Sequence, residues 1–349
     1  MVRPLDRHPF REGALSAVIA AIFFGVTTPF IQLAGKGAGA IPTAALLYAG
    51  AAFASTDRGT QRDREAPVRM SSFPRLLLVA AFGAVIAPMC LAWGLQRTGA
   101  VGASLLLNFE AAFTVLFGWV FFHEHVGWRV GLALALMVAA GACLVYGASS
   151  GGIGWGAIAI VVATLAWALD NALTRPMADL NPTQVVRWKA SFGALFSFAL
   201  SSIVRQPFPP VRNAVVLIAC GALGYGLSLR FYLRAQRAIG AGRTGSVFAV
   251  APFIGAVAAW SLGDRTVGPL TVVAACLFMA ALYLHLTEQH EHLHTHEELE
   301  HEHAHRHDDG HHDHVHDPPV EGEHSHVHRH AGQTHAHGHG PDTHHRHSH

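Results

Sequence analysis

The sequence predicts an all-α integral membrane protein, with ten membrane-spanning helices followed by a disordered, histidine-rich tail. Three observations support this fold class: a low charge content, long apolar runs and an internal repeat. Of the 349 residues, 51% are hydrophobic and 13% are charged, about half the charged fraction of a typical soluble domain. A surface with so few charges suits lipid better than water.

The charge is divided unevenly along the chain. Residues 1–286 carry 21 basic and 10 acidic residues, a net charge of +11, whereas residues 287–349 carry 3 basic and 13 acidic residues and 23 of the 27 histidines. The second part has too few apolar residues to bury a core, so we expect it to be disordered when free of metal. We therefore divide the chain into an N-terminal segment (1–12), two repeats (13–146 and 154–286) and a tail (287–349).

Apolar runs mark the expected spans, because about 20 apolar residues cross the hydrocarbon core as a helix. The weakest run contains Pro42 and is rich in alanine and glycine. The first run also resembles a signal peptide, but it is longer than a typical signal core and the repeat requires it as a helix. The expected spans are 13–33, 37–55, 74–95, 100–122, 129–146, 154–175, 184–203, 214–233, 244–262 and 267–286.

The distribution of arginine and lysine predicts the orientation. With ten spans and the N-terminus inside, the inner connections hold 14 of these residues and the outer connections hold 5. Cytoplasmic connections are the ones enriched in basic residues. We therefore expect a multi-pass protein of the inner (plasma) membrane with both termini, and hence the tail, in the cytoplasm.

The two halves of the chain repeat one another. Gln96-Arg97 corresponds to Gln236-Arg237, and Glu124 corresponds to Asp264, both at an offset of 140. Upstream, Phe24-Gly25 corresponds to Trp167-Ala168 at an offset of 143. Five spans per repeat force the two copies to lie in opposite orientations. This inverted-repeat design is typical of secondary transporters, which bind solute between the repeats and expose it alternately to each side.

Several segments also carry a family resemblance. They include Leu107–Glu110, Asp170–Arg175, Gly224–Leu229 and Ala251–Gly255. In these segments the halves resemble EamA domains of the drug/metabolite transporter (DMT) superfamily, and the chain resembles a bacterial subgroup with a histidine-rich C-terminal tail. The resemblance implies ten helices and solute translocation, usually export, without fixing the substrate. Two departures are Ala111-Ala112, where a proline is common, and Asp264, where glutamate is usual.

Polar residues within the spans are candidates for a substrate pathway, because ionisable groups at membrane depth are costly and usually face a cavity or a partner. Glu110 lies near the middle of its span and could bind a cation or exchange a proton; alternatively it is a buried, permanently protonated carboxyl group. Asp170 is either a second coupling carboxylate or an ion-pair partner of Arg175 or Lys189. The candidate set is Glu110, Asn108, Thr114, Asp170, Asn171, Lys189, Trp167 and Tyr225.

Histidines at every second position of the tail predict metal binding. Imidazole nitrogens suit Zn, Ni, Co and Cu ions. The alternative is a solvated acidic tail whose histidines carry no ligand. The candidate ligands are His290, His292, His294, His296, His301, His303, His305, His307, His312, His314, His316, His324, His326, His328, His330, His335, His337 and His339. We read His123-Glu124-His125 as a hydrated span boundary rather than a metal site.

Three functions compete. The first is a carrier that exports a small organic solute or cation, with a metal-binding tail. The second is a divalent-metal transporter, and the third is a membrane anchor for a metal-buffering tail. No enzyme activity is expected, because the glycine pattern at Gly240–Gly245 follows a membrane span and the HExxH matches arise by chance in a histidine-rich tract. We expect no required cofactor and no nucleic-acid partner, and a homodimer is compatible with the sequence.

Overall fold

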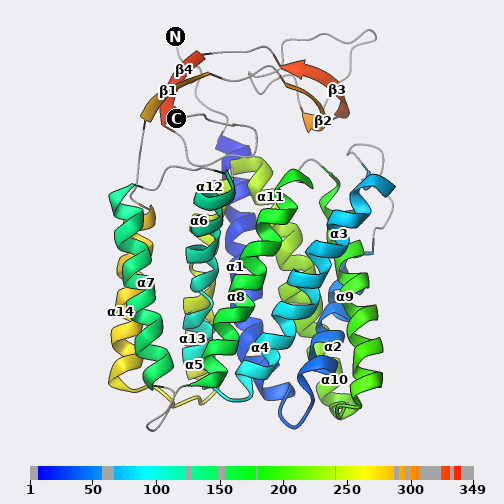
Figure 1. Ribbon diagram of the computed structural model, residues 1–349, viewed down its shortest axis with the longest axis vertical. Helices are drawn as coiled ribbons and strands as arrows, with labels where there is room; N and C mark the ends of the chain where they lie inside the picture. The colour runs from blue at the N-terminus through cyan, green and yellow to red at the C-terminus, as the bar shows by residue number, and fades with distance from the viewer. Residues whose placement is uncertain are drawn as a thin grey trace.

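The computed structural model is a bundle of helices that lie side by side along one direction (Figure 1). It describes residues 7–56, 67–122, 127–147, 154–177, 180–239, 241–286, 291–295, 299–305, 324–330 and 334–338. His123-Glu124-His125 and tail histidines 290, 296, 307, 312, 314, 316 and 339 lie outside the described residues.

The helices of the first half follow the apolar runs. In lipid, each span must satisfy its own backbone hydrogen bonds, which a helix does. The elements are α1 (Arg7–Ala34), α2 (Ala40–Ala54), the 3₁₀ turn η1 (Met70–Ser72), α3 (Phe73–Ala80), the π-helical segment η2 (Ala81–Ile86), α4 (Ala87–Leu95), α5 (Ala100–Leu106), α6 (Phe109–Phe122) and α7 (Trp128–Gly147).

The helices of the second half repeat this order. In each half a π-helical segment interrupts the third expected span. They are α8 (Trp155–Thr174), the 3₁₀ turn η3 (Arg175–Met177), α9 (Pro182–Val204), α10 (Val211–Cys220), the π-helical segment η4 (Gly221–Leu227), α11 (Ser228–Ile239), α12 (Ala241–Phe248), α13 (Ala251–Ser261) and α14 (Pro269–Leu286).

Six described helical stretches are long and apolar enough to cross a membrane. They are Glu12–Ala34, Met70–Leu95, Ala100–Phe121, Trp128–Gly147, Trp155–Met177 and Val211–Gln236. Shorter apolar helices occupy Ala40–Ala54, Ala251–Ser261 and Pro269–Leu284, and α9 occupies the span expected at 184–203. Each expected span therefore contains helix in the described residues, and the count of ten crossings stays a prediction.

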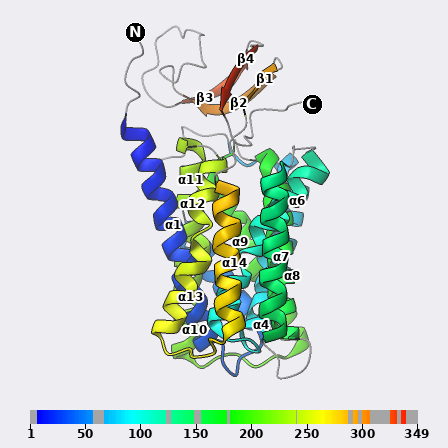
Figure 2. The same ribbon diagram turned by 90° about the vertical axis from the view of Figure 1, so that its left-hand side faces the viewer.

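Packing between the halves is mirrored. Helix α1 packs against α11 and α13, and its counterpart α8 packs against α4 and α6. Likewise α2 packs against η4, and α9 packs against η2, while α7 pairs with its own counterpart α14. The start of α1 and the end of α14 lie at the same end of the bundle (Figure 2). This arrangement is the one that two inverted repeats would produce.

The described parts of the tail are extended. Strand β1 (Glu291–Thr295) pairs antiparallel with β4 (Thr334–Gly338), and β2 (Leu299–His305) pairs antiparallel with β3 (His324–His330). These four segments are paired strands, and the disorder expected for the metal-free tail as a whole stays a prediction. Histidine at every second position matches the two-residue period of a strand.

Glycines allow α2 to pack closely against α10 and the π-helical segment η4 that continues it. A Cβ at Gly221 would collide with the carbonyl of Leu47, and a Cβ at Gly50 would collide with the carbonyl of Ile218. Lipid tails are as apolar as side chains, so helix association in a bilayer depends on such close packing. The crossing also brings the η4 segment toward α2, and both elements line the pocket described below.

We expect Gly221→Ala to destabilise the protein by about 1–3 kcal/mol, because the added methyl group overpacks the crossing with α2. Gly131→Ala is the matched control, since a Cβ at Gly131 meets no atom within 4 Å. Thermal unfolding of both purified variants in lipid nanodiscs measures the difference. Equal unfolding temperatures for the two variants would contradict the close crossing.

Candidate functional site

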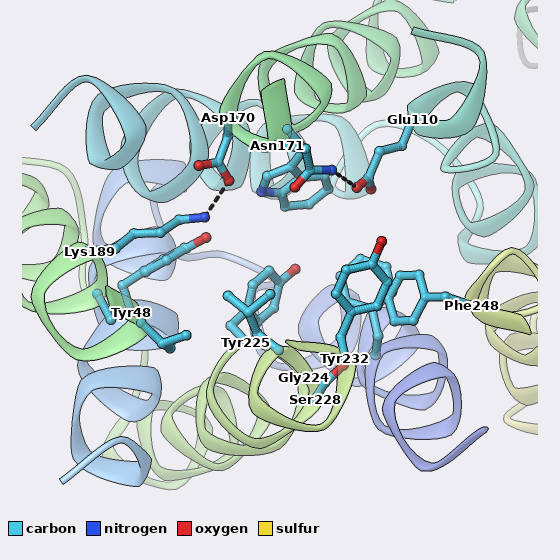
Figure 3. Close-up of a pocket in the computed structure, with 15 residues that line it drawn as sticks. Tyr48, Glu110, Asp170, Asn171, Lys189, Gly224, Tyr225, Ser228, Tyr232 and Phe248 are labelled. Carbon is cyan, nitrogen blue, oxygen red and sulfur yellow. Dashed lines mark hydrogen bonds and ion pairs between the residues drawn. The ribbon is translucent and has the colours of Figure 1, made fainter. Parts of the chain in front are cut away.

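A pocket lies between the two halves of the chain. Helices α1, α2 and α6 of the first half and α8, α9, η4, α11 and α12 of the second half line it. The lining encloses about 670 Å³ of space, including the open mouth. Figure 3 shows the polar side chains of the pocket converging from these helices. A site shared by both repeats is the one that a carrier with two inverted halves requires.

A buried ion pair forms one side of the pocket. The Nζ of Lys189 donates to Oδ2 of Asp170, and the two residues are 7% and 2% exposed. The hydroxyl of Thr174, one turn beyond Asp170, lies 3.4 Å from Oδ1. Because the pair joins α8 to α9 and neither charge reaches water readily, each charge depends on the other.

The carbonyl of Gly83 anchors two aromatic side chains of the pocket. Trp167 donates to it through Nε1 at 3.0 Å, and the hydroxyl of Tyr48 donates to the same oxygen. Gly83 lies in the π-helical segment η2, a type of segment that is frequent at functional sites. A Cβ at this position would collide with the carboxyl group of Asp170. The glycine therefore lets the backbone, the ion pair and both rings meet.

Glu110 lies across the pocket from the ion pair. It is the second residue of α6, directly after the break between α5 and α6 at Leu107 and Asn108. Asn171 Nδ2 donates to Oε1 of Glu110 at 2.9 Å. Among the described side chains no cation pairs with Glu110, so the carboxyl group has a neutral donor and faces open space (Figure 3).

Aromatic side chains form most of the remaining wall. The ring of Phe24 lies 6.0 Å from Trp167, 5.8 Å from Tyr225 and 5.5 Å from Phe248, measured between ring centroids. Tyr232 contacts Phe248 edge-on at 5.0 Å. The wall thus combines apolar faces with phenolic hydroxyl groups, and its rings restrain one another by packing.

The end of the bundle far from the start of α1 is held together by side chains that cap backbone groups. Gln32 donates to the carbonyls of Leu95 and Thr98 at 2.9 and 2.8 Å. Gln96 donates to the carbonyls of Gly35 and Ala38 at 3.1 and 3.0 Å. These bonds tie the connection between α1 and α2 to the connection between α4 and α5.

Asp264 adds a bond between the two halves at the same end. Its Oδ2 accepts from the N–H of Val101 at 3.0 Å, and its Oδ1 accepts from the N–H and hydroxyl of Thr266. Burial raises the pKa of Asp264, but these hydrogen bonds outweigh it and hold the pKa below its ordinary value. The carboxylate therefore stays charged at neutral pH and keeps the start of α5 bound to the end of α13.

Six of the eight predicted pathway residues line the pocket: Glu110, Asp170, Asn171, Lys189, Trp167 and Tyr225. Asn108 and Thr114 do not. Asn108 is buried and donates to the carbonyl of Leu105 at 2.9 Å, which caps the helix break. Thr114 is exposed on the bundle surface and donates to the carbonyl of Glu110 at 2.8 Å. Both side chains therefore use their hydrogen-bond donor on a backbone carbonyl one turn away.

Four aromatic residues that line the pocket were not among the residues predicted from the sequence: Phe24, Tyr48, Tyr232 and Phe248. One of them carried a usable signal. Phe24 is the repeat counterpart of Trp167, a predicted pathway residue, and the two rings contact each other in the pocket. Tyr48 lies on α2, whose residues are apolar on all sides, so nothing in the sequence marks its inner face. Tyr232 and Phe248 lie on the amphipathic helices α11 and α12, but amphipathicity alone does not identify the face that lines the pocket.

Comparison with known proteins identifies the two halves. The profile of the EamA-like transporter family matches residues 11–147 and 154–287. The chain belongs to the EamA-like transporter family. A protein from Methanothermobacter thermautotrophicus, described as an uncharacterized transporter, is 25% identical over 271 residues, covering 71% of this chain and 78% of that protein. The resemblance of the two halves to EamA domains is thus confirmed, whereas the subgroup with a histidine-rich tail stays a prediction. The family points to a transporter rather than an enzyme.

A solved crystal structure has the same fold. It superposes with a TM-score of 0.57 and 17% identity, covering 77% of this EamA-like chain and 95% of the other. At this identity the likeness shows the arrangement of the helices and nothing of the cargo.

We expect Asp170→Asn and Lys189→Met each to destabilise this EamA-like transporter by about 3 kcal/mol, because each leaves one buried charge without a partner. The double variant should recover a large part of the loss, since no charge is then left unpaired. Thermal unfolding of the three variants forms a double-mutant cycle. Exposed Glu12, changed to Gln, is the matched control. Additive losses in the double variant would contradict the ion pair.

Proposed function

We propose that this EamA-like protein is a secondary carrier that exports a small organic solute or cation by alternating access. The observation that carries the proposal is the pocket, which both halves build together and which holds ionisable groups at membrane depth. Ionisable side chains inside a membrane domain usually serve a pathway. The family supports transport as such, and the pocket supports an organic cargo because aromatic rings form most of its wall.

Alternating access requires that one end of the pathway be closed while the other gives entry. In the proposed carrier, the bonds of Gln32, Gln96 and Asp264 to backbone groups would hold closed the end far from the start of α1. With the N-terminus in the cytoplasm, that end faces the outside of the inner membrane, and the pocket is loaded from the cytoplasm. The excess of basic residues in the inner connections supports this orientation.

Glu110 would couple solute to a proton or counter-ion. It lies at the pocket without a cationic partner among the described side chains, whereas Asp170 is already balanced by Lys189. A carboxyl group in this position can exchange a proton during each cycle, and a change in its charge would alter what the pocket binds. Asp170 would then hold the structure rather than carry the coupling ion.

A divalent metal ion is less suited to this pocket. Among the described side chains of the helical bundle, no three His, Cys, Asp or Glu residues lie close enough to hold a metal ion. Glu110 and Asp170 are both in the pocket, but Lys189 adds a positive charge beside them. The metal chemistry of the chain would therefore belong to the tail.

We assign the tail a metal-binding role on the cytoplasmic side. In the β1–β4 ladder, His292 is opposite His337 and His294 is opposite His335. In the β2–β3 ladder, three further histidine pairs are opposite one another, namely His301 with His328, His303 with His326, and His305 with His324. Positions two apart on neighbouring strands share a face, so each ladder brings four or more imidazole-bearing positions to one face. This grouping suits Zn, Ni, Co or Cu.

We expect Glu110→Gln to lower proton-coupled transport at least about tenfold, because the amide cannot release a proton. The measurement uses proteoliposomes that contain the dye pyranine and a panel of organic amines, amino acids and sugars added outside. Glu12→Gln, far from the pocket and exposed, should keep wild-type flux. Unchanged proton movement in Glu110→Gln would exclude Glu110 as the coupling group.

Deleting residues 287–349 should remove Zn and Ni binding while solute flux persists. Calorimetric metal titration of full-length and truncated protein, with flux measured on the same preparations, separates the two roles. If flux disappears together with metal binding, the tail is part of the pathway. If flux is absent in both proteins and metal retention follows the tail, the membrane domain is an anchor for a metal store.

A further inference from the structure

The pocket carries an uneven set of charges. Asp170 and Lys189 cancel each other through their ion pair, and Thr174 adds a hydrogen bond to the carboxylate. Glu110 has Asn171 as its neutral donor. An ionised Glu110 therefore leaves the pocket with one negative charge that the described side chains do not balance. A half-buried carboxylate is stabilised by a partner of opposite charge, and this pocket leaves that partner to be supplied from solution.

The ionisable groups that face Glu110 across the pocket are few. Among the described side chains that line the pocket, none besides Lys189 is basic, and Lys189 is committed to Asp170. The other groups are phenols, which stay neutral at physiological pH. Taken over every element that lines the pocket, the set is Asp170 on α8, Lys189 on α9, Tyr48 on α2, Tyr225 on η4 and Tyr232 on α11.

The wall next to Glu110 is aromatic. In Figure 3 the hydroxyl of Tyr232 and the ring of Phe248 lie on the side of the pocket that the Glu110 carboxyl group faces. Phe24 completes this wall by contacting Phe248. Aromatic faces attract organic cations through their negative electrostatic potential, and they also take up the apolar part of such a molecule. A bare metal ion would find a single carboxylate there.

We infer that the pocket takes an organic monocation, with its positive charge against Glu110 and its apolar part against the wall of Phe24, Tyr232 and Phe248. An anion would meet Glu110 and no uncommitted cation among the described side chains, and a dication would remain half unbalanced. The passage of this cation across the membrane rests on the proposed carrier function, whereas its binding does not.

Proton and cation compete in this arrangement, because both neutralise the same carboxylate. Binding of a permanently charged ammonium ion should therefore weaken as pH falls. Once Glu110 is mostly protonated, the apparent Kd should rise by about tenfold for each further pH unit. A neutral aromatic molecule should show no such dependence.

The test is calorimetric titration of the full-length protein in lipid nanodiscs with benzyltrimethylammonium. Benzyl alcohol, phenylacetate and magnesium ions serve as the neutral, anionic and divalent comparisons, each over a neutral-to-acidic pH series. We expect benzyltrimethylammonium to bind tightest, with the pH dependence described above. Equal affinity for benzyl alcohol, or tighter binding of phenylacetate or magnesium, would overturn the inference.

Two variants test separately the contact of the cation with the Glu110 carboxylate and its contact with the aromatic wall. Glu110→Gln should weaken benzyltrimethylammonium binding by about tenfold to a hundredfold and remove its pH dependence, since a charge-assisted contact is lost. Phe248→Leu should weaken it by about fivefold and keep the pH dependence, since only the aromatic face is lost. Glu12→Gln should bind as wild type does. If Glu110→Gln does not fold, Glu110→Asp keeps the test decisive, because it must preserve the pH dependence with altered affinity.

Different results would contradict cation binding and the proposed carrier function. Cation binding with the expected pH dependence, but no cation flux in proteoliposomes, would uphold the inference and reject the carrier function. Flux of neutral solutes together with unchanged cation affinity in Glu110→Gln would overturn the inference and leave the carrier function standing.

Discussion

The ion pair between Asp170 and Lys189 is the interaction on which the pocket depends. Two charges inside an apolar bundle can be stable only when they meet, so the pair fixes α8 against α9 at one relative height. That contact in turn requires a glycine at position 83, because any larger residue would collide with the Asp170 carboxyl group. With α8, α9 and η2 held together, the carbonyl of Gly83 is in place to accept hydrogen bonds from Tyr48 and Trp167.

The internal repeat explains why the pocket lies where it does. The π-helical segments η2 and η4 begin at Ala81 and Gly221, an offset of 140. Each half therefore has a wider helical turn at the same place in its third expected span. Wide turns disturb the regular backbone bonding of a helix and recur at functional sites. Here one segment supplies the Gly83 carbonyl, and the other supplies Gly224 and Tyr225 to the pocket wall. Two copies of one local irregularity therefore serve the same site: η2 holds Trp167 and Tyr48 by its carbonyl, and η4 forms part of the pocket wall.

The sequence could predict the charged half of the site but only part of the aromatic half. A carboxylate or ammonium group in an apolar run is conspicuous, so Glu110, Asp170 and Lys189 could be selected without a structure. Phe24 and Tyr48 could not be selected by hydrophobicity, because lipid and protein interior are equally apolar and their helices have no marked polar face. Tyr232 and Phe248 lie on amphipathic helices, but segregation of polar and apolar residues alone does not identify the face that lines the pocket. Asn108 and Thr114 do not line the pocket, although they were predicted to. Spacing alone does not tell whether a polar side chain turns to the pocket or bonds to its own backbone. The paired strands of the tail depend on a register that alternation permits but does not specify.

The distribution of charge in the pocket bears directly on how a carrier of this design could couple two fluxes. When Glu110 is ionised and the pocket is empty, closing both ends would enclose an unbalanced charge in a space with few polar groups, which is costly. When Glu110 holds a proton or a monocation, the same closure encloses no net charge. The Asp170–Lys189 pair contributes nothing to this difference, because its charges cancel in every state. A single unbalanced carboxylate would thus allow the two loaded forms to change sides and hinder the empty one, which is the condition for exchange of one ion for the other.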